Sequence, residues 1–548
     1  MNQIEQDLKT TIQEAVKLVF DIELDMNQIV IEIPREVAHG DYASNVAMRL
    51  TKEVKRNPRE IAEELKAKML EKKELIKNIE IAGPGFINFF VHNEQLVNVI
   101  TKVLSEGDDY GKSDFGAGLK LNVEFVSANP TGDLHPGHAR GAAIGDSVCR
   151  ISKKAGYEVT SEYYINDAGA QIDNMGKSLQ ARYLQLFGVE IELPEDGYHG
   201  PDLIEIAERI KNEVGDQYLN VPLEDSFLFF REYGLKEELE KLKSDLSLFR
   251  VEFDVWSSER SIYERGLVEK AVETLKTMGV TYEEEGALWL RTTDFNDDKD
   301  RVIIKSSGDY TYLTPDIAYH LDKFERGFEK LVNFLGADHH SYVTRLKAAV
   351  QALGHNSEDL EVDLIQMVRM IKDGKEFKMS KRTGKALALK DLLEEAGVDA
   401  IRYFFASRAA DTQMDLDLDL ATKQSNENPV YYAQYAHARM CSILKSGEAF
   451  PITDSFTLLT NQKEVDLLKH VNEFPAVVAD AAKNRQAHRV CNYIQKLAAY
   501  FHSFYGECKV LDETELQLSS ERLALVKAVR MTLKNALELV GVNAPEYM

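Results

Sequence analysis

The sequence feature that most restricts the possible folds is a strand, a turn and a helix in direct succession around residue 130. Residues 120–126 (KLNVEFV) are rich in β-forming residues, a Pro-Thr-Gly-Asp turn follows, and residues 138–154 are helical in character. Gly156 lies close to the position where such a helix should be capped. This succession is the first half of a βαβ unit and predicts a parallel sheet covered by helices. Apolar runs at 302–304 and 331–335, with helices between them, are expected to continue the α/β pattern.

A chain of 548 residues is too long for one hydrophobic core and predicts several domains. Residues 1–110 are expected to form a small α+β domain. Three isoleucines alternate at 29–33 as in a strand, residues 57–75 are helical in character, and two strand-like runs flank Gly83-Pro84-Gly85.

The rest of the chain divides by composition. A linker rich in Gly, Asp and Ser at 107–118 leads into the α/β domain, which we place at 111–428. Within it, residues from about 185 to 255 are highly charged and largely helical, as expected of an insertion, and their function cannot be inferred. Residues 429–548 are one predicted helix after another, which indicates a helical bundle.

The charge distribution bears on nucleic-acid binding. Lys and Arg number 66 and Asp and Glu 91, a net charge of −25 that would repel nucleic acid if it were evenly spread. It is not even, because residues 429–548 hold 13 cations and 13 anions and are neutral. The acidic middle of the chain and its neutral C-terminal part therefore present different surfaces.

Cysteine usage and hydropathy indicate where the protein works. Its four cysteines are widely spaced and form no Cys-x-x-Cys pair, so we expect no disulfide framework and no structural metal. The sequence has no apolar run of the ~20 residues that would span a bilayer, and its start lacks the features of a signal peptide. We expect a cytoplasmic protein with no membrane partner.

The turn after the predicted strand carries two histidines. His135 and His138 lie three residues apart at the start of the predicted helix, where free N–H groups and the helix dipole favour an anion such as phosphate. Gly137 between them would let a ligand approach the backbone closely. A metal pair and an ordinary turn with incidental histidines are the alternatives, and these residues alone do not decide among them.

A second segment bears on the choice among these three interpretations. Residues 377–384 read Phe-Lys-Met-Ser-Lys-Arg-Thr-Gly, a basic loop that by itself indicates only a solvated surface. His-x-Gly-His after the first strand of an α/β domain, followed downstream by Lys-Met-Ser-Lys, is the signature pair of class I aminoacyl-tRNA synthetases, which this sequence resembles. One departure is Pro136, where the class usually has an aliphatic residue; proline is acceptable at a helix start.

Further segments resemble arginyl-tRNA synthetases in particular. They are Glu124–Asn129, Tyr164–Gly169, Tyr312–Asp316, Gly336–His340, Asp399–Tyr403 and Asn428–Arg439. The resemblance runs the length of the chain. It implies a class I Rossmann-type catalytic domain with a parallel sheet and a loop at 378–382, an N-terminal α+β domain that contacts tRNA, and a C-terminal helical anticodon-binding domain.

For ATP, the resemblance implies that His135 and His138 donate hydrogen bonds to the phosphates. Lys378 and Lys381 would close over the leaving pyrophosphate, with Ser380 assisting. Gly336 would give the nucleoside room and Asp338 would accept from the ribose hydroxyls. Gly137 and Met379 complete the expected ATP site, and Mg²⁺ would accompany ATP, held mainly by its phosphates and water.

For arginine, the resemblance implies guanidinium ligands at Glu259, Tyr312 and Asp316. A planar guanidinium with five donors requires carboxylates held in its plane. The family's remaining arginine contacts fall on Glu124, Ser127, Asn129 and His340. Without the resemblance, Asp316 after Pro315 would more often be a helix cap.

For tRNA, the resemblance implies contacts from both outer domains. Tyr432, Tyr435 and Met548 would approach the anticodon loop, and Phe86 and Asn88 the D-loop. Tyrosines at that helical spacing are more often core residues, and Phe86 could equally belong to a buried strand pair, so these roles depend on the resemblance.

The expected activity is ATP-dependent formation of arginyl-adenylate and transfer of arginine to the 2′-hydroxyl of the terminal adenosine of tRNA(Arg), with tRNA present during activation, by a monomer. The alternatives are a synthetase-like RNA-binding protein without catalysis, another nucleotidyltransferase such as a cytidylyltransferase, and a class I synthetase for another amino acid. Intact phosphate-binding elements disfavour the first, and the tyrosine-bearing bundle disfavours the second.

Overall fold

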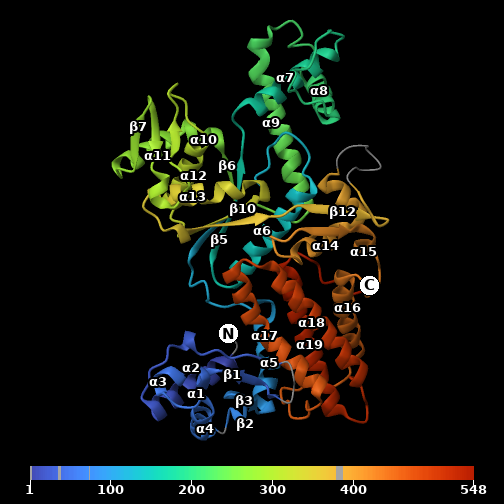
Figure 1. The fold of residues 1–548 in the computed structure, drawn as a ribbon. Coiled ribbons are helices and arrows are strands. Elements are labelled where there is room, and N and C mark those ends of the chain that lie inside the picture. Colours follow the sequence, from blue (N-terminus) through green and yellow to red (C-terminus); the bar gives the residue numbers. More distant parts are fainter. Residues whose placement is uncertain (1–2, 35–38, 73, 378–386) are drawn as a thin grey trace.

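The computed structural model describes residues 3–34, 39–72, 74–377 and 387–548. Figure 1 shows a small N-terminal domain at one end, a helical bundle beside it, a central sheet, and a group of helices that projects from the far end. No helix in the described part of the chain combines the length and apolar composition needed to cross a bilayer.

The centre of the molecule is a five-stranded parallel sheet in the order β11-β10-β4-β5-β6. The strands are β4 (Lys120–Glu124), β5 (Glu158–Ile165), β6 (Val255–Ser258), β10 (Lys330–Gly336) and β11 (Leu360–Ile365). The chain leaves β4 toward β5 on one side and later returns to β10 on the other, so β4 marks the point where the winding reverses. The predicted parallel sheet and the strand at 331–335 are confirmed.

Helix α6 (Pro136–Lys154) follows β4 and packs on the sheet, against α14 (Leu389–Ala406) and against α17 (Gln462–Asn484) of the bundle. It starts two residues before the predicted position because Pro136 is accommodated in its first turn. Its end is as expected, with Gly156 at φ +93° just after the last turn.

The strand predicted at 302–304 exists, but it does not belong to the parallel sheet. It is β9 (Arg301–Ile304), which pairs antiparallel with β8 (Ala287–Leu290), itself paired antiparallel with β7 (Thr281–Glu284). Glu285 and Gly286 connect β7 to β8 with φ of +50° and +75°, the conformation of a tight hairpin turn. This small sheet packs with α10 (Glu259–Glu264), α11 (Leu267–Thr277), α12 (Leu313–Glu325) and α13 (His340–Ala352).

The predicted insertion is helical but has different limits. Its helices are α7 (Ala170–Gln185), α8 (Pro201–Val214) and α9 (Leu223–Leu248), and residues 186–200 contain no helix. The three helices share a core of their own that includes Met175, Tyr183, Ile206 and Phe230. We call α7, α8 and α9 the helical module.

The N-terminal domain has a three-stranded antiparallel sheet in the order β1-β3-β2. It contains β1 (Tyr42–Ser44), β2 (Ile76–Ala82) and β3 (Phe86–Val91) with α1 (Gln3–Phe20), α2 (Val46–Arg49), α3 (Thr51–Val54) and α4 (Pro58–Met69). The strand predicted at 29–33 is wrong, because this segment joins the sheet only through a single bridge between Glu32 and Ala43. The helix predicted at 57–75 ends at Met69 and the predicted hairpin is confirmed.

Residues 429–548 are helical and contain no strand, as predicted. The helices are α16 (Pro429–Ser446), α17 (Gln462–Asn484), α18 (Ala487–Glu507) and α19 (Leu516–Leu539), and α5 (Asn93–Glu106) packs on α17 and α19. A third small sheet, of β12 (Val368–Lys372), β13 (Lys375–Glu376) and β14 (Met414–Asp417), and α15 (Leu418–Thr422) complete the connection from the parallel sheet to the bundle.

Candidate active site

Two residues after β4, the backbone enters a conformation that side chains rarely adopt. Val126 and Ser127 have φ of +68° and +42°, in the left-handed region where L-residues are strained. The turn lets Ser127 Oγ donate to Glu124 Oε1 at 3.2 Å and accept from the backbone N–H of Tyr164 at 3.1 Å. The ends of β4 and β5 are thereby joined where open α/β sheets bind ligands.

Three carboxylates gather around Tyr164 beside this turn. Burial raises the pKa of the Tyr164 phenol, and the charges of Glu259, Asp316 and Glu124 raise it further. Burial also raises the pKa of Glu259, although a hydrogen bond from Tyr164 opposes the shift. The structure therefore brings together acids from β4, α10 and α12 that are far apart in the sequence.

Asp316 is not a helix cap. Its Oδ2 accepts a hydrogen bond from the hydroxyl of Tyr342 on α13, and α12 has no side-chain cap. Burial raises the pKa of Asp316 to about 7; the bond from Tyr342 opposes the shift, and the charges of Glu124 and Glu259 add to it. A cation placed between these acids would favour their ionised forms.

One of the three acids is already compensated. Lys323 Nζ lies 2.6 Å from Glu124 Oε2 and 4.2 Å from the centre of the Tyr319 ring, and its ammonium is buried. Within the described residues, neither Glu259 nor Asp316 has a lysine or arginine nitrogen within 4.0 Å. The site thus holds more carboxylates than cations.

The two histidines of the turn cap the helix and each other. His135 Nδ1 accepts from the N–H groups of Gly137 (3.1 Å) and His138 (3.3 Å), and His135 N–H donates to His138 Nδ1 at 3.4 Å. The rings are stacked with centroids 3.6 Å apart. Because Nδ1 accepts in each ring, the neutral tautomer carries its proton on Nε2, which can donate to a ligand.

The protein keeps both imidazoles neutral. Desolvation lowers the pKa of His135 below its ordinary value and that of His138 to about 4. The sequence analysis missed a steric requirement for glycine between them. A Cβ on Gly137 would lie 2.9 Å from Cε1 of His135, which is too close. Gly137 therefore makes room for the His135 cap, whether or not it also admits a ligand.

The remaining predicted residues are placed as follows. Gly336 ends β10, Asp338 lies in the following turn with its side chain 82% exposed, and His340 begins α13 and is exposed. Tyr312 precedes α12 and is 94% exposed, so it is not packed among the acids. Asn129 donates to Gln171 Oε1 at 2.7 Å. Lys378, Met379, Ser380 and Lys381 lie outside the described residues.

Sequence reasoning missed three members of the site. They are Tyr164, Lys323 and Tyr342. Tyr164 belongs to a segment already noted as similar to the family, and Lys323 lies two turns after Asp316 on one face of α12, so both could have been found. Tyr342 had no such signal.

Comparison with family models accounts for nearly the whole chain. The arginyl-tRNA synthetase N-terminal domain matches residues 3–91, and the class I (R) tRNA synthetase catalytic domain matches 99–440. The DALR anticodon-binding domain matches 433–548.

The chain belongs to the arginyl-tRNA synthetase family.

Individual members of the family agree over their full length. The arginine–tRNA ligases of Bacillus cereus and Bacillus subtilis are each 54% identical to this chain, with coverage of 100% of the chain and of 100% and 99% of the relatives. The fold matches the Thermus thermophilus arginyl-tRNA synthetase with a TM-score of 0.77 at 22% identity, covering 99% of this chain and 100% of that one. The activity is that of an arginine–tRNA ligase, with arginine, tRNA and ATP as substrates. The predicted family, fold class and activity are confirmed.

In the C-terminal domain, the rings of the two predicted tyrosines, Tyr432 and Tyr435, both lie beside the ring of His502 on α18. Their ring centroids lie 4.8 Å (Tyr432) and 6.0 Å (Tyr435) from that of His502. Tyr435 is 37% exposed, whereas Tyr432 packs against the bundle core. Arg439, one turn after Tyr435, donates to the Tyr505 hydroxyl at 2.8 Å and had not been predicted. Met548 is 55% exposed.

In the N-terminal domain, the two predicted tRNA contacts differ in accessibility. Phe86 begins β3 and is 37% exposed, which is at odds with a fully buried strand pair. Asn88 is 4% exposed, because it lies on the central strand between Ala43 of β1 and Glu80 of β2. Only Phe86 offers an accessible side chain in this structure.

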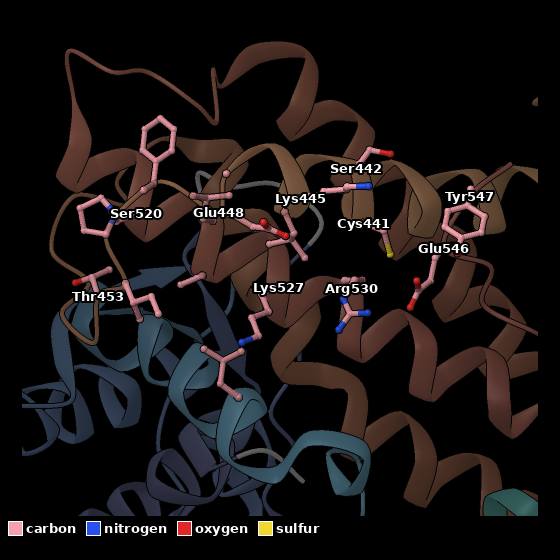
Figure 2. Close-up of a pocket in the computed structure, with 18 residues that line it drawn as sticks. Cys441, Ser442, Lys445, Glu448, Thr453, Ser520, Lys527, Arg530, Glu546 and Tyr547 are labelled. Atoms are coloured by element: carbon pink, nitrogen blue, oxygen red, sulfur yellow. The ribbon is translucent and has the colours of Figure 1, made fainter.

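Two cavities are relevant to ligand binding. One of about 270 Å³ borders His135 and the helical module. A larger one, of about 830 Å³, lies in the bundle between α16 and α19, where Lys445, Lys527 and Arg530 point toward it (Figure 2). Its α16 lining includes Cys441, nine residues after Tyr432 and therefore about half a helical turn in angle from it. The larger cavity is thus separate from the tyrosine face.

Proposed function

We propose that the chain activates arginine as arginyl-adenylate and transfers the arginyl group to the 2′-hydroxyl of the terminal adenosine of tRNA(Arg). The observation that carries this proposal is the surplus of carboxylates in the site. Glu259 and Asp316 lie with Glu124 around Tyr164, and among the described residues only Glu124 has a buried ammonium beside it. Such a site attracts a substrate cation.

In this proposal the guanidinium lies between Asp316 and Glu259, with Tyr312 covering it once arginine is bound. Burial now raises the pKa values of both carboxylates. Charge-assisted hydrogen bonds from the guanidinium would stabilise their ionised forms and oppose that shift. Ser127, Asn129 and His340 hold the α-amino and carboxylate ends, and Glu124, anchored by Lys323, forms the wall of the pocket.

ATP binds at the switch point. The neutral Nε2–H groups of His135 and His138 donate to its phosphates, while Gly336 and Asp338 take the adenosine. Lys378, Met379, Ser380 and Lys381 complete the ATP site, and the two lysines neutralise the leaving pyrophosphate. Adenylate formation is attack of the arginine carboxylate on the α-phosphorus, so the chain contributes position and charge and no nucleophile of its own.

Mg²⁺ is proposed to arrive with ATP. The described residues contain no group of three or more His, Cys, Asp or Glu side chains arranged to hold a metal ion. A Mg²⁺ ion bound mainly by phosphate oxygens and water needs no such group. Bound there, it would neutralise phosphate charge.

Transfer RNA is proposed to contact Tyr432, Tyr435 and Met548 with its anticodon loop and Phe86 with its D-loop. Asn88 is left out of direct contact because it is buried. We further propose that activation requires bound tRNA, that the enzyme is a cytoplasmic monomer, and that its domains are residues 1–110, 111–428 and 429–548.

The test is pyrophosphate exchange and aminoacylation with each amino acid in turn, with and without tRNA(Arg). We expect exchange with arginine alone among the amino acids, dependent on tRNA, and acid-stable charging blocked by a 2′-deoxy terminal adenosine. Exchange with lysine or another amino acid would contradict the specificity. Charging of the 2′-deoxy tRNA would contradict the transfer site.

A further inference from the structure

Helix α9 is shared by two hydrophobic cores. Its first half contributes Phe230 and Leu235 to the core of the helical module. Its second half contributes Leu242 and Leu246 to the core of the parallel sheet. Figure 1 shows this 26-residue helix running from the projecting module down to the sheet. The part of α9 between Leu235 and Leu242 therefore connects the module to the catalytic domain.

In this connecting part of α9, Lys241 is surrounded by acids from three elements. Its Nζ lies 2.6 Å from Oδ1 of Asp133 in the histidine turn, 3.9 Å from Oδ2 of Asp202 on α8 and 4.0 Å from Oε2 of Glu238 on α9. The Asp133 contact is a close ion pair. One ammonium thus joins the turn that carries His135 to α8 and α9 of the module.

The same group faces the cavity beside His135. This cavity of about 270 Å³ is lined by Gly132, Asp133 and His135 on one side and by Asp202 and Glu238 on the other. Three carboxylates therefore border the space next to the proposed phosphate site. Without a cation among them, their charge would oppose the approach of a polyphosphate.

Glu238 shows how closely the group depends on Lys241. Its side chain is 2% exposed, and its Oε1 has no hydrogen-bond partner among the described residues. Burial raises the pKa of Glu238 to about 7; Lys241 opposes the shift, Asp202 and Asp133 add to it, and Arg209 of α8 opposes it more weakly. Removing Lys241 would leave Glu238 facing Asp202 and Asp133 without the cation that most opposes its pKa shift.

We propose that Lys241 is a positioning residue for ATP: it holds the histidine turn against the helical module and neutralises Asp133, Asp202 and Glu238 so that the polyphosphate can enter. The inference assigns a role in ATP binding to the module. It rests on the proposed binding of phosphate at His135.

The first test is arginine-dependent pyrophosphate exchange at saturating arginine and tRNA, with the full-length enzyme. Lys241→Gln should raise the KM for ATP by about tenfold with kcat within about twofold, because the loss is one of electrostatic compensation. Lys241→Arg should keep a KM near that of the parent. Lys236→Gln, an exposed lysine on the same helix, is the matched control and should change neither value.

A double variant separates charge compensation from simple packing. Asp133→Asn together with Lys241→Gln should give a lower KM for ATP than Lys241→Gln alone, because one of the uncompensated acids is gone. The KM defect of Lys241→Gln should also grow from about pH 6.5 to about pH 8.5 as Glu238 ionises. Thermal unfolding of every variant is recorded alongside.

The inference is overturned if Lys241→Gln has the KM for ATP of the Lys236→Gln control. It is equally overturned if the variant only lowers thermal stability and kcat, with a KM that neither the double variant nor pH alters. Absence of arginine-dependent exchange in the parent enzyme would instead contradict the proposed function, so the two failures are distinguishable.

Discussion

Lys323 on α12 places its Nζ 2.6 Å from Oε2 of Glu124 at the end of β4, where the ammonium is fully buried. A buried pair of this kind adds little stability over well-packed apolar residues, but losing one partner leaves an unpaired charge inside the protein. The pair compensates Glu124, whereas Glu259 and Asp316 have no lysine or arginine nitrogen within 4.0 Å among the described residues, as the proposed binding of a substrate cation requires.

We predict that Lys323→Met lowers the free energy of unfolding by about 3–5 kcal/mol, because Glu124 is left buried without its partner. Denaturant unfolding followed by circular dichroism measures the loss. Lys323→Met combined with Glu124→Gln should recover most of it. Equal stability of the single and double variants would show that Glu124 does not depend on Lys323.

Asp316→Asn should raise the KM for arginine much more than the KM for ATP. The change removes one charged partner of the guanidinium, an interaction worth about 1.5–3 kcal/mol. Tyr342→Phe serves as the control, since it removes the hydrogen bond to Asp316 but keeps the carboxylate. If both KM values rise together in Asp316→Asn, Asp316 acts on the fold and not on arginine.

The raised pKa of Asp316 predicts a pH dependence of arginine binding. With a pKa of about 7 in the folded enzyme against 3.8 ordinarily, Asp316 binds its proton more tightly when folded. Its contribution to stability is thus present at low pH and is lost as pH rises from about 4 to 7. If arginine binds Asp316 as proposed, it requires the ionised form, so its KM should fall from pH 6 to about pH 8. A profile that is flat in the parent, or unchanged by Asp316→Asn, would assign the effect to another group.

Gly137→Ala should impair the histidine pair. The new Cβ would lie 2.9 Å from the His135 ring, so the ring must move and α6 loses its cap, at a cost of about 1 kcal/mol. We expect a higher KM for ATP in pyrophosphate exchange. Gly141→Ala, on the same helix with nothing within 4 Å of its Cβ, is the control and should gain about 0.5–1 kcal/mol of stability. Indistinguishable behaviour of the two variants would remove the steric argument.

Tyr435→Ala should weaken tRNA binding by about 1–3 kcal/mol without unfolding the bundle, because its ring is partly exposed. The double change with Tyr432→Ala should weaken binding further but also cost stability, since Tyr432 packs on the core. Filter binding at several salt concentrations, with circular dichroism of each variant, separates the two effects. Unaltered affinity of folded Tyr435→Ala would make both tyrosines structural.

The parts of the fold that the sequence could predict are those that residues of a single segment specify. The strand, turn and helix from residue 120 to 154 follow from hydrophobic periodicity and turn chemistry within one segment, and the histidine pair lies inside it. By contrast, the residues at 302–304 form a strand that pairs with the hairpin before it and not with the parallel sheet. The isoleucines at 29–33 alternate as in a strand, but their segment meets the sheet only through a bridge between Glu32 and Ala43. Neither outcome is contained in the segment itself.

The proposed arginine pocket shows the same limit. Glu124 and Ser127 are indicated by a segment that resembles the family, and no pattern in the strand itself predicts them. That Asp316 bonds to Tyr342 instead of capping α12 depends on how α13 packs beside it, which no local pattern specifies. The pairing of Lys323 with Glu124 joins residues 199 positions apart.

The order of strands in the central sheet has a consequence for synthesis of the chain on the ribosome. β4 lies at the middle of the sheet and pairs with β10, which comes much later in the chain. Lys120, the first residue of β4, bonds to Glu329, just before β10 and 209 residues further along the sequence. At a synthesis rate of about 5–20 residues per second, β4 is translated some 10–40 s before the strand that pairs with one of its edges. The N-terminal domain, whose strands all lie before residue 92, can fold during that interval. The catalytic sheet cannot, and its growing half is the stage at which a nascent chain most needs protection from aggregation.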